Sequence, residues 1–136
     1  MKIGFTCGVF DLFHAGHVLM LRECRANCDF LLVALNKADN FSEEINPGKR
    51  KPFFTLEERK LIMESCRYVD EVITYNSEEE LLEIMKSRQI DIRFLGEDYR
   101  GREITGKELG IPVYYTDRSH GLSTTGILQR IYNHKK

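Results

Sequence analysis

Apolar residues along the chain follow two patterns, a continuous run of strand length and runs spaced by three or four residues. Residues 30–35 are apolar throughout, as in a parallel strand that is covered on both faces. Val18, Leu21 and Cys24 recur at helical spacing. Read along the chain, these patterns predict strands in the first half of residues 4–17 and at 30–35, 69–75, 90–95 and 112–116, and helices at 16–28, 55–68, after Ser77, briefly near Lys107, and at 126–131.

Polar residues mark the starts of two of these helices. Thr55 with Glu58, and Ser77 with Glu80, have the form of a capping box, in which a hydroxyl and a carboxylate satisfy the first free N–H groups of a helix. Residues 36–54 show no periodicity and contain the basic run 49–51. We therefore predict a long mobile loop there, of the kind that often covers a ligand site.

The alternation of strands and helices predicts the fold class. Elements in this order favour an α/β fold with a single doubly wound parallel sheet of about five strands, a Rossmann-like arrangement with right-handed crossovers. The 136 residues are enough for one domain with a buried core. We expect residues 1–136 to form that single domain.

Charge and composition exclude several classes of protein. The 20 basic and 21 acidic residues nearly cancel, which gives no sign of affinity for nucleic acid or for an anionic membrane. No apolar run reaches membrane-spanning length and no leader pattern precedes the first strand, so we expect a cytoplasmic protein. The four cysteines lack the spacing of a zinc site or a redox pair, and we expect reduced thiols. Because the total charge is close to zero, a site for an anion must come from a local group of residues and not from the overall charge.

Residues 4–17 carry the first candidate site. They read Gly-Phe-Thr-Cys-Gly-Val-Phe-Asp-Leu-Phe-His-Ala-Gly-His, a strand, a turn and the start of a helix. If the helix begins near Ala15, the imidazoles of His14 and His17 both lie at its N-terminal end, where free N–H groups and the helix dipole favour an anion. The pattern predicts a phosphate site. Asp11 would either hold the Gly8 turn or help to place a metal ion.

Residues 118–125 carry the second candidate site, Arg-Ser-His-Gly-Leu-Ser-Thr-Thr. Ser123 and Thr124 can cap the following helix, or they can present hydroxyls beside free N–H groups to a triphosphate. Asp98 follows the strand at 90–95, and ligand sites in parallel sheets form beyond the carboxyl ends of strands; a solvated loop carboxylate fits the sequence equally well. The two helix starts can meet only if the crossovers bring both to the carboxyl edge of the sheet.

Three segments resemble the motifs of one family. Residues 8–17 resemble the G-x-F-D-x-x-H-x-G-H signature of cytidylyltransferase-type nucleotidyltransferases, and 67–72 resemble the R-Y-V-D-E-V motif of that family. Residues 118–125 are similar to its R-T-E-G-I-S-T-T motif, with Ser119, His120 and Leu122 replacing threonine, glutamate and isoleucine.

The resemblance implies an activity. Such enzymes transfer CMP from CTP to a small phosphorylated alcohol and release pyrophosphate, and the chain looks most like members that use glycerol 3-phosphate. The resemblance also implies Mg²⁺ as the cofactor, brought with the triphosphate, since no cluster of protein ligands for a metal is visible. It implies a homodimer with residues 67–72 at the interface.

The resemblance also implies roles for individual residues. It assigns the binding of the reacting phosphates to five residues: His14, His17, Lys49, Arg67 and Arg118. Lys51 is an alternative to Lys49, and Arg67 could instead be a surface arginine near a helix C-terminus. The nucleotide-binding residues that it implies are Cys7, Gly8, Val9, Phe10, Asp11, Gly16, Asp98, Ser123, Thr124 and Thr125, although a packing role fits Cys7 as well.

Two other functions fit the sequence. Residues 96–99 and 104–106 also resemble sugar-phosphate adenylyltransferases that act on heptose 1-phosphate, whereas Arg118 favours the cytidylyl interpretation. A non-catalytic nucleotide-binding sensor would keep the same fold, but the presence of both histidines and of Arg118 argues against it. A redox protein is disfavoured, because no cysteine pair has redox spacing.

Overall fold

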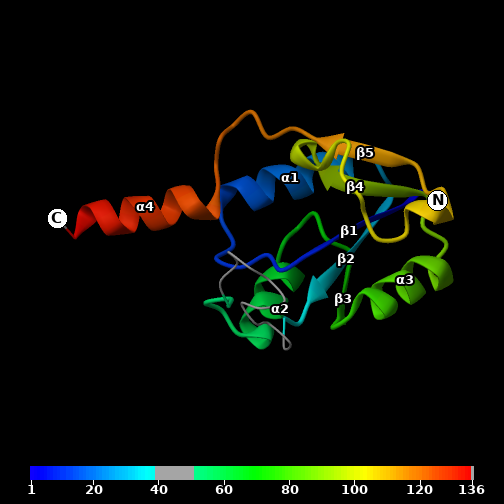
Figure 1. Ribbon diagram of the computed structural model, residues 1–136, viewed down its shortest axis with the longest axis horizontal. Helices are drawn as coiled ribbons and strands as arrows, with labels where there is room; N and C mark the ends of the chain where they lie inside the picture. The colour runs from blue at the N-terminus through cyan, green and yellow to red at the C-terminus, as the bar shows by residue number, and fades with distance from the viewer. Residues whose placement is uncertain (39–50, 136) are drawn as a thin grey trace.

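The computed structural model describes residues 1–38 and 51–135 of the chain. Five parallel strands, β1 (Ile3–Gly8), β2 (Phe30–Asn36), β3 (Glu71–Tyr75), β4 (Ile92–Gly96) and β5 (Val113–Thr116), form one sheet in the order β3-β2-β1-β4-β5 (Figure 1). The strand order reverses direction between β1 and β4, which defines a doubly wound sheet. The predicted fold class is confirmed, and the predicted strand bounds agree with the observed ones to within two residues.

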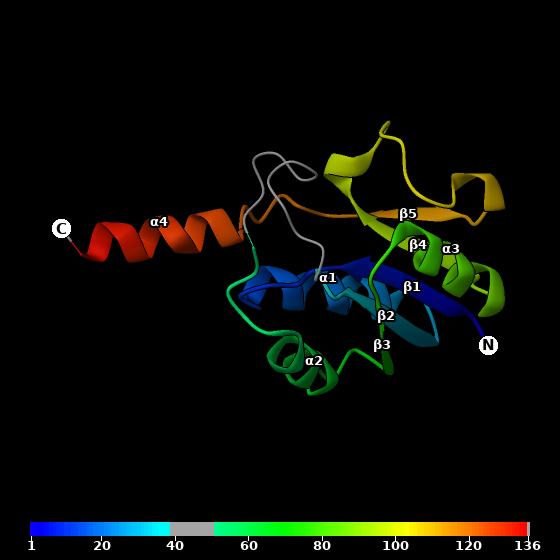
Figure 2. The same ribbon diagram turned by 60° about the horizontal axis from the view of Figure 1, so that its bottom comes forward.

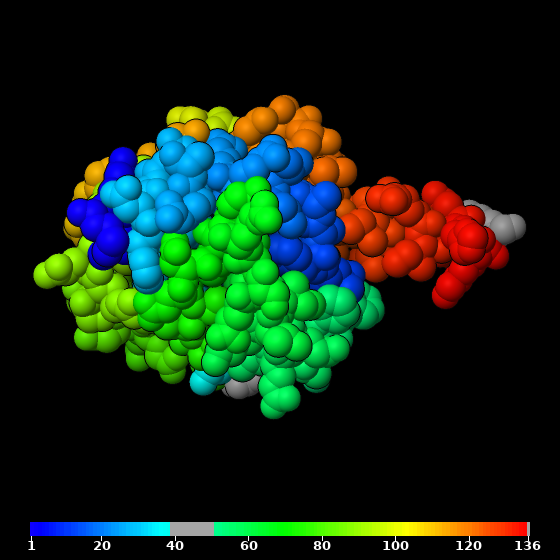
Figure 3. All heavy atoms as spheres, turned by 180° about the vertical axis from the view of Figure 1, so that it is seen from behind, coloured from blue at the N-terminus to red at the C-terminus, as the bar shows by residue number. Residues whose placement is uncertain are grey.

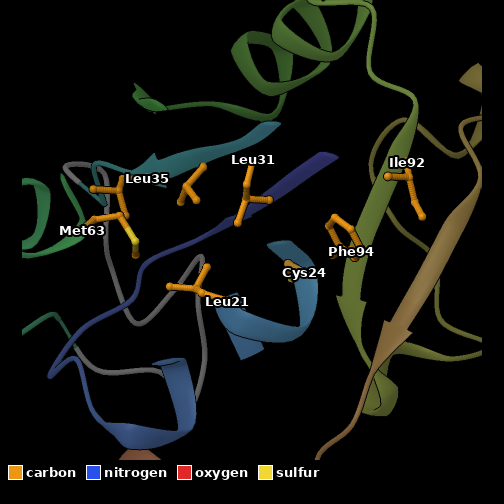
Figure 4. Packing of buried hydrophobic residues seen from close by; sticks show 8 residues of the cluster. Leu21, Cys24, Leu31, Leu35, Met63, Ile92 and Phe94 are labelled. Atoms are coloured by element: carbon orange, nitrogen blue, oxygen red, sulfur yellow. The ribbon is translucent and has the colours of Figure 1, made fainter. Parts of the chain in front are cut away.

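Helices cover both faces of the sheet. On one face, α1 (Ala15–Ala26) and α2 (Leu56–Glu64) place Leu21, Cys24 and Met63 against the strands (Figure 4). On the other face, α3 (Glu78–Ser87) contributes Leu81 and Met85. Side chains of β2 alternate between the two clusters, and this burial on both sides explains the continuous apolar run at 30–35. The short 3₁₀ turns η1 (Glu97–Tyr99) and η2 (Lys107–Leu109) lie between β4 and β5.

Two local predictions differ from the structure. The helix predicted to reach Tyr68 ends at Glu64, because the Ser65 hydroxyl donates back to the Leu61 carbonyl at 2.9 Å and the chain then turns tightly. At α3, the Ser77 hydroxyl accepts the Glu80 N–H as expected, but the Glu80 carboxylate accepts the N–H of Asn76, one residue before the predicted donor. Only half of that capping box is present.

The last helix, α4 (Thr124–His134), projects from the body of the molecule (Figures 1, 2 and 3). None of its described residues is buried. Its first turn lies beside the start of α1, so the helix carries site residues at its base and solvent along most of its length. Within 1–38 and 51–135, no helix combines the length and the apolar character that crossing a membrane requires.

Candidate active site

A cleft of about 650 Å³ opens at the carboxyl ends of the strands, where the strand order reverses. In an open parallel sheet this is the expected place for a ligand. Most of the predicted site residues line the cleft: Cys7, Gly8, Val9, Phe10, His14, Gly16, His17, Arg118, Ser123, Thr124 and Thr125. The two candidate segments, from opposite ends of the sequence, therefore face one cavity.

The two histidines form an unusual capping box at the start of α1. His14 is the N-cap residue, and its Nδ1 accepts the N–H of Gly16 at 3.0 Å. The Nδ1 of His17 accepts the N–H of His14 at 3.1 Å. Each side chain thus satisfies one of the free N–H groups at the helix start, a task that hydroxyl and carboxylate side chains usually perform.

This arrangement fixes the tautomers of both rings. A neutral imidazole carries one proton, and a ring nitrogen that accepts a hydrogen bond cannot hold it. Because both Nδ1 atoms accept, both protons are on Nε2. The site therefore presents two Nε2–H donors to a ligand, and the backbone sets their direction.

Packing keeps the two rings close and uncharged. Their centroids are 3.9 Å apart, and the His17 ring is stacked on Phe13 with centroids at 5.3 Å. Burial, with smaller contributions from His14 and Arg118, lowers the pKa of His17 to about 4. Burial and the charge of Arg118 also lower the pKa of His14. Both histidines are therefore neutral donors at physiological pH.

The base of α4 meets this pair. Ser123 is the N-cap of α4 and accepts the N–H of Gly126 at 3.0 Å, so it fills one of the two roles that the sequence allows for it. The Thr124 hydroxyl lies 3.4 Å from Nε2 of His14. Two helix N-termini, each favourable for an anion, thus converge on the same cleft.

Gly16 allows this close approach. A Cβ atom at position 16 would lie 2.7 Å from Cε1 of His14 and 3.1 Å from Cβ of Leu122. The glycine is buried, and its missing side chain makes room for the His14 ring on one side and the 118–125 segment on the other. Its role is steric, which spacing alone did not indicate.

The turn after β1 differs from the prediction centred on Gly8. The residues with positive φ are Phe10 (52°) and Leu12 (50°), and Gly8 is not among them. Left-handed backbone is unfavourable for such side chains, so the surrounding structure must hold it. In this turn it brings the Phe10 ring to 5.5 Å from that of His17.

Asp11 does not face the cleft. Its two carboxylate oxygens accept the backbone N–H groups of Phe53 and Phe54, at 2.8 and 2.9 Å. Asp11 is not among the residues that line the cleft, but its negative charge acts on His17, where it opposes the lowering of the pKa. The structure assigns Asp11 to joining the β1–α1 loop to the segment that leads into α2.

Arg59 is a structural residue that the sequence did not single out. It is 3% exposed and donates to the carbonyls of Val9, Asn36, Lys37 and Phe54 at 2.7–3.3 Å. One guanidinium thus ties the β1–α1 loop to both ends of the connection between β2 and α2 at the carboxyl edge. In the sequence it stands in a polar run at 57–60, where an exposed position is the ordinary expectation.

Glu23, on α1, is a second residue of this kind. Its carboxylate accepts the Tyr114 hydroxyl and the Asp117 N–H, both at 2.9 Å. It fixes the segment that carries Arg118. Asp98 lies 3.7 Å from Arg118 but is not among the residues that line the cleft, so it contacts the site through that arginine.

Two predicted phosphate-binding residues are not placed in the cleft. Arg67 is exposed and precedes β3, at the amino ends of the strands, opposite to the site. The neighbouring Asp70 and Glu71 pair with Arg25 and Arg88 of the same chain. Lys49, with most of the predicted 36–54 loop, lies outside the described residues, and Lys51 is exposed and does not line the cleft.

The described residues contain no group of three or more histidine, cysteine or acidic side chains that could hold a metal ion. The cleft does include the carboxylate of Glu103. This donor set fits a magnesium ion that arrives bound to triphosphate oxygens and takes few ligands from the protein.

A doubly wound sheet with paired imidazole donors and two helix N-termini at its switch point defines an α/β protein with a site suited to anions. A family model described as cytidylyltransferase-like matches residues 5–130. The chain belongs to this cytidylyltransferase-like family, as the resemblance of its motifs indicated.

Relatives of two kinds are similar to the chain. A glycerol-3-phosphate cytidylyltransferase of Bacillus subtilis is 36% identical, over 96% of this chain and 98% of the relative. The bifunctional protein HldE of Gluconacetobacter diazotrophicus is also 36% identical, but the chain spans only 27% of the length of that relative. Among solved structures, a lipopolysaccharide core biosynthesis protein of Thermoplasma volcanium matches with a TM-score of 0.66 and 26% identity, over 85% of this chain and 93% of that one.

Proposed function

We propose that the protein transfers CMP from CTP to a small phosphorylated alcohol, with glycerol 3-phosphate as the first candidate, and releases pyrophosphate. The observation that carries the proposal is the convergence of the two Nε2–H donors with the start of α4, as shown by the 3.4 Å contact between His14 and Thr124. The near full-length match to the Bacillus subtilis cytidylyltransferase supports the choice of nucleotide and acceptor.

The reaction needs alignment and charge stabilisation rather than a protein nucleophile. An oxygen of the acceptor phosphate attacks the α-phosphorus of CTP in line; a P–O bond forms, and the bond to the leaving pyrophosphate oxygen breaks. In the proposal, His14 and His17 donate to oxygens on the α-phosphate and to the bridging oxygen, where negative charge increases. No proton has to move, which agrees with two imidazoles held neutral.

Other residues would hold the outer phosphates. Arg118 is at the mouth of the cleft and is positioned through Glu23, and Ser123 and Thr124 present hydroxyls and N–H groups at the start of α4. Bound magnesium would neutralise part of the triphosphate charge. Lys49 stays a prediction of the family resemblance, and Arg67 can act at the phosphates only if it reaches a cleft other than that of its own chain.

Assembly and location are also part of the proposal. We infer a homodimer from the resemblance of residues 67–72, although Tyr68 and Val69 already pack partly against the core of their own chain. We infer a cytoplasmic location, because all four cysteines are free, as is usual in a reducing compartment. Sedimentation of the purified protein would test the dimer.

A second candidate function is adenylyl transfer to a sugar phosphate. The observation that favours it is the placement of Tyr99, Ile104 and Thr105, from the segments that resemble heptose-1-phosphate adenylyltransferases, in the lining of the cleft. A cleft wall of this kind would contact the part of the substrate that differs between the two activities.

The test is pyrophosphate release with magnesium, with CTP, ATP, GTP and UTP each combined with glycerol 3-phosphate, ethanolamine phosphate and a heptose 1-phosphate. Release with CTP and glycerol 3-phosphate that is lost in His17→Ala would support the proposal. Turnover with ATP and the heptose phosphate alone would establish the second candidate. Nucleotide binding without turnover in any combination would identify a sensor.

A further inference from the structure

The cleft has a second, polar arm on the α3 face of the sheet. Phe94 packs in the cluster on the α1 face, so its neighbour Arg93 points to the opposite face. Cys7 and Tyr75 pack in the cluster on that opposite face. The arm consists of Cys7, Tyr75, Glu78, Arg93 and Thr105, which all line the cleft, and it is called the Arg93 subsite below.

Arg93 is a buried cation with an incomplete set of partners. It is 5% exposed, and its Nη1 donates to the Thr105 carbonyl. Its Nε is buried, and no hydrogen-bond partner for it exists among the described residues. A buried guanidinium with an unused donor is unfavourable unless something completes it. Because Arg93 lines the cleft, a ligand can provide the missing acceptor.

The other members of the subsite offer complementary groups. Glu78 accepts the Thr105 hydroxyl, and its carboxylate has acceptor capacity left because each carboxylate oxygen has more than one lone pair. Tyr75 adds a largely buried phenol. Burial raises the pKa of the Cys7 thiol, so Cys7 stays protonated and is not a nucleophile. The subsite thus combines donors and acceptors without a reactive group.

The subsite is separate from the phosphate-binding groups. His14, His17, Ser123 and Thr124 belong to the starts of α1 and α4, and none of the five residues of the Arg93 subsite comes from either helix. The subsite can therefore bind a part of the substrates other than the triphosphate. Hydroxyl groups both donate and accept hydrogen bonds, as the combination of an arginine donor and a glutamate acceptor requires.

We propose that the Arg93 subsite binds the hydroxyl groups of the acceptor and selects polyol phosphates over phosphates that lack hydroxyls. This inference rests on the proposed function, since it assigns the acceptor of that reaction. Arg93 would donate to one hydroxyl oxygen through Nε, and Glu78 would accept from a neighbouring hydroxyl.

The test compares glycerol 3-phosphate with ethyl phosphate, which has no hydroxyl groups, in Arg93→Lys and Glu78→Gln. We expect each substitution to raise the KM for glycerol 3-phosphate about tenfold, the effect of losing one charged hydrogen bond, and to leave the KM for CTP within about twofold. The KM for ethyl phosphate should not change, so selectivity between the two acceptors should fall. Glu83→Gln, an exposed position on the same helix outside the cleft, is the matched control.

Two results would overturn the proposal. One is a rise in the KM for CTP with the acceptor KM unchanged, which would place the base or ribose in the subsite. The other is an unchanged ratio between the two acceptors. If Arg93→Lys fails to fold, Glu78→Gln decides, because Glu78 is exposed at the start of α3 and its neutral isostere keeps the side-chain shape.

Binding measurements separate this proposal from the proposed function. If no nucleotide and acceptor give pyrophosphate, the proposed function fails, and calorimetric titration of glycerol 3-phosphate into the protein still tests the subsite. About tenfold weaker binding to Glu78→Gln than to wild type, with Glu83→Gln unchanged, would support it. Equal binding to all three would refute it.

Discussion

The Nδ1 of His17 accepts the backbone N–H of His14 at 3.1 Å. The side chain of His17 thus helps to hold the backbone that carries the other catalytic candidate, His14. Helix capping and ligand binding use different nitrogens of the same rings. The ring geometry is therefore set before any ligand arrives, and the cost of orienting the donors is met during folding.

Because Nδ1 of His14 caps the helix and Nε2 is left for a ligand, a substitution at His14 should be able to remove the activity and keep the helix cap. Asparagine is among the best N-cap residues but has no group where Nε2 lies, so His14→Asn should keep the stability of α1 and lower kcat by about 10²- to 10³-fold. His14→Ala should lose the activity and also about 1 kcal/mol of unfolding free energy. Urea unfolding and pyrophosphate release measure the two effects, with His134→Asn as the exposed control. Full activity of His14→Asn would contradict the assignment of Nε2 as a donor.

The lowered pKa of His17 predicts a pH-dependent stability. In the unfolded chain His17 takes up a proton near its ordinary pKa of 6.5, but in the folded protein only near 4. The neutral form of His17 therefore makes its full contribution to the free energy of unfolding above pH 6.5. That contribution is lost as the pH falls from 6.5 towards 4. Between pH 7.5 and 5.0 the loss should be about 2 kcal/mol.

Urea unfolding of wild type and His17→Gln at both pH values measures this loss. The variant should lose about 2 kcal/mol less than wild type, since glutamine does not titrate. The pKa of His14 is shifted in the same direction and contributes to both proteins. Equal losses in the two proteins would show that His17 is not the responsible group.

Gly16 should not tolerate even a methyl group. Alanine is favoured over glycine in a helix by about 1 kcal/mol, so at an open position Gly16→Ala would stabilise α1. Here the new Cβ would meet the His14 ring at 2.7 Å, and displacing that ring should lower kcat/KM at least about tenfold. Gly126→Ala, in the first turn of α4, is the comparison, because its Cβ would approach only the Ser123 hydroxyl, at 3.2 Å. An active Gly16→Ala enzyme would mean that the rings can move without loss.

Replacing Arg59, which does not line the cleft, should lower the stability of the protein strongly. Arg59→Met would leave four backbone carbonyls of two loops without their donor, and the unfolding free energy should fall by about 3 kcal/mol. Arg22→Met, at an exposed position of α1, should change it by less than about 0.5 kcal/mol. Chemical denaturation measures both. A small effect at Arg59 would show that water or other side chains can replace its bonds.

Much of the fold follows from local patterns. The buried run 30–35 and the capping residues Thr55 and Ser77 report contacts that lie within a few residues, and the observed elements agree with them. The meeting of His14 with Thr124, 110 residues apart, could also be predicted, because the carboxyl ends of parallel strands share one edge.

The remaining features depend on tertiary contacts that a local pattern does not carry. Arg59 stands near a polar helix start and Arg93 in a strand, and an arginine at either position could face solvent. The sequence pattern therefore does not show that both are buried. The helical spacing of 126–131 predicts a helix but not its direction, and Ile131 is 50% exposed on the projecting α4. Arg67 was placed at the phosphates by motif resemblance alone, and the direction of β3 puts it at the opposite edge in its own chain.

The Arg59 bonds also have a consequence for the length of the chain between two of their acceptors. The carbonyls of Lys37 and Phe54 are bound by the same guanidinium, so the chain leaves and rejoins the scaffold at one anchored point. Lengthening a segment between fixed ends costs little, about 0.6 kcal/mol for each doubling. An insertion between residues 37 and 54 should therefore cost little stability, as long as both carbonyls keep their bonds to Arg59.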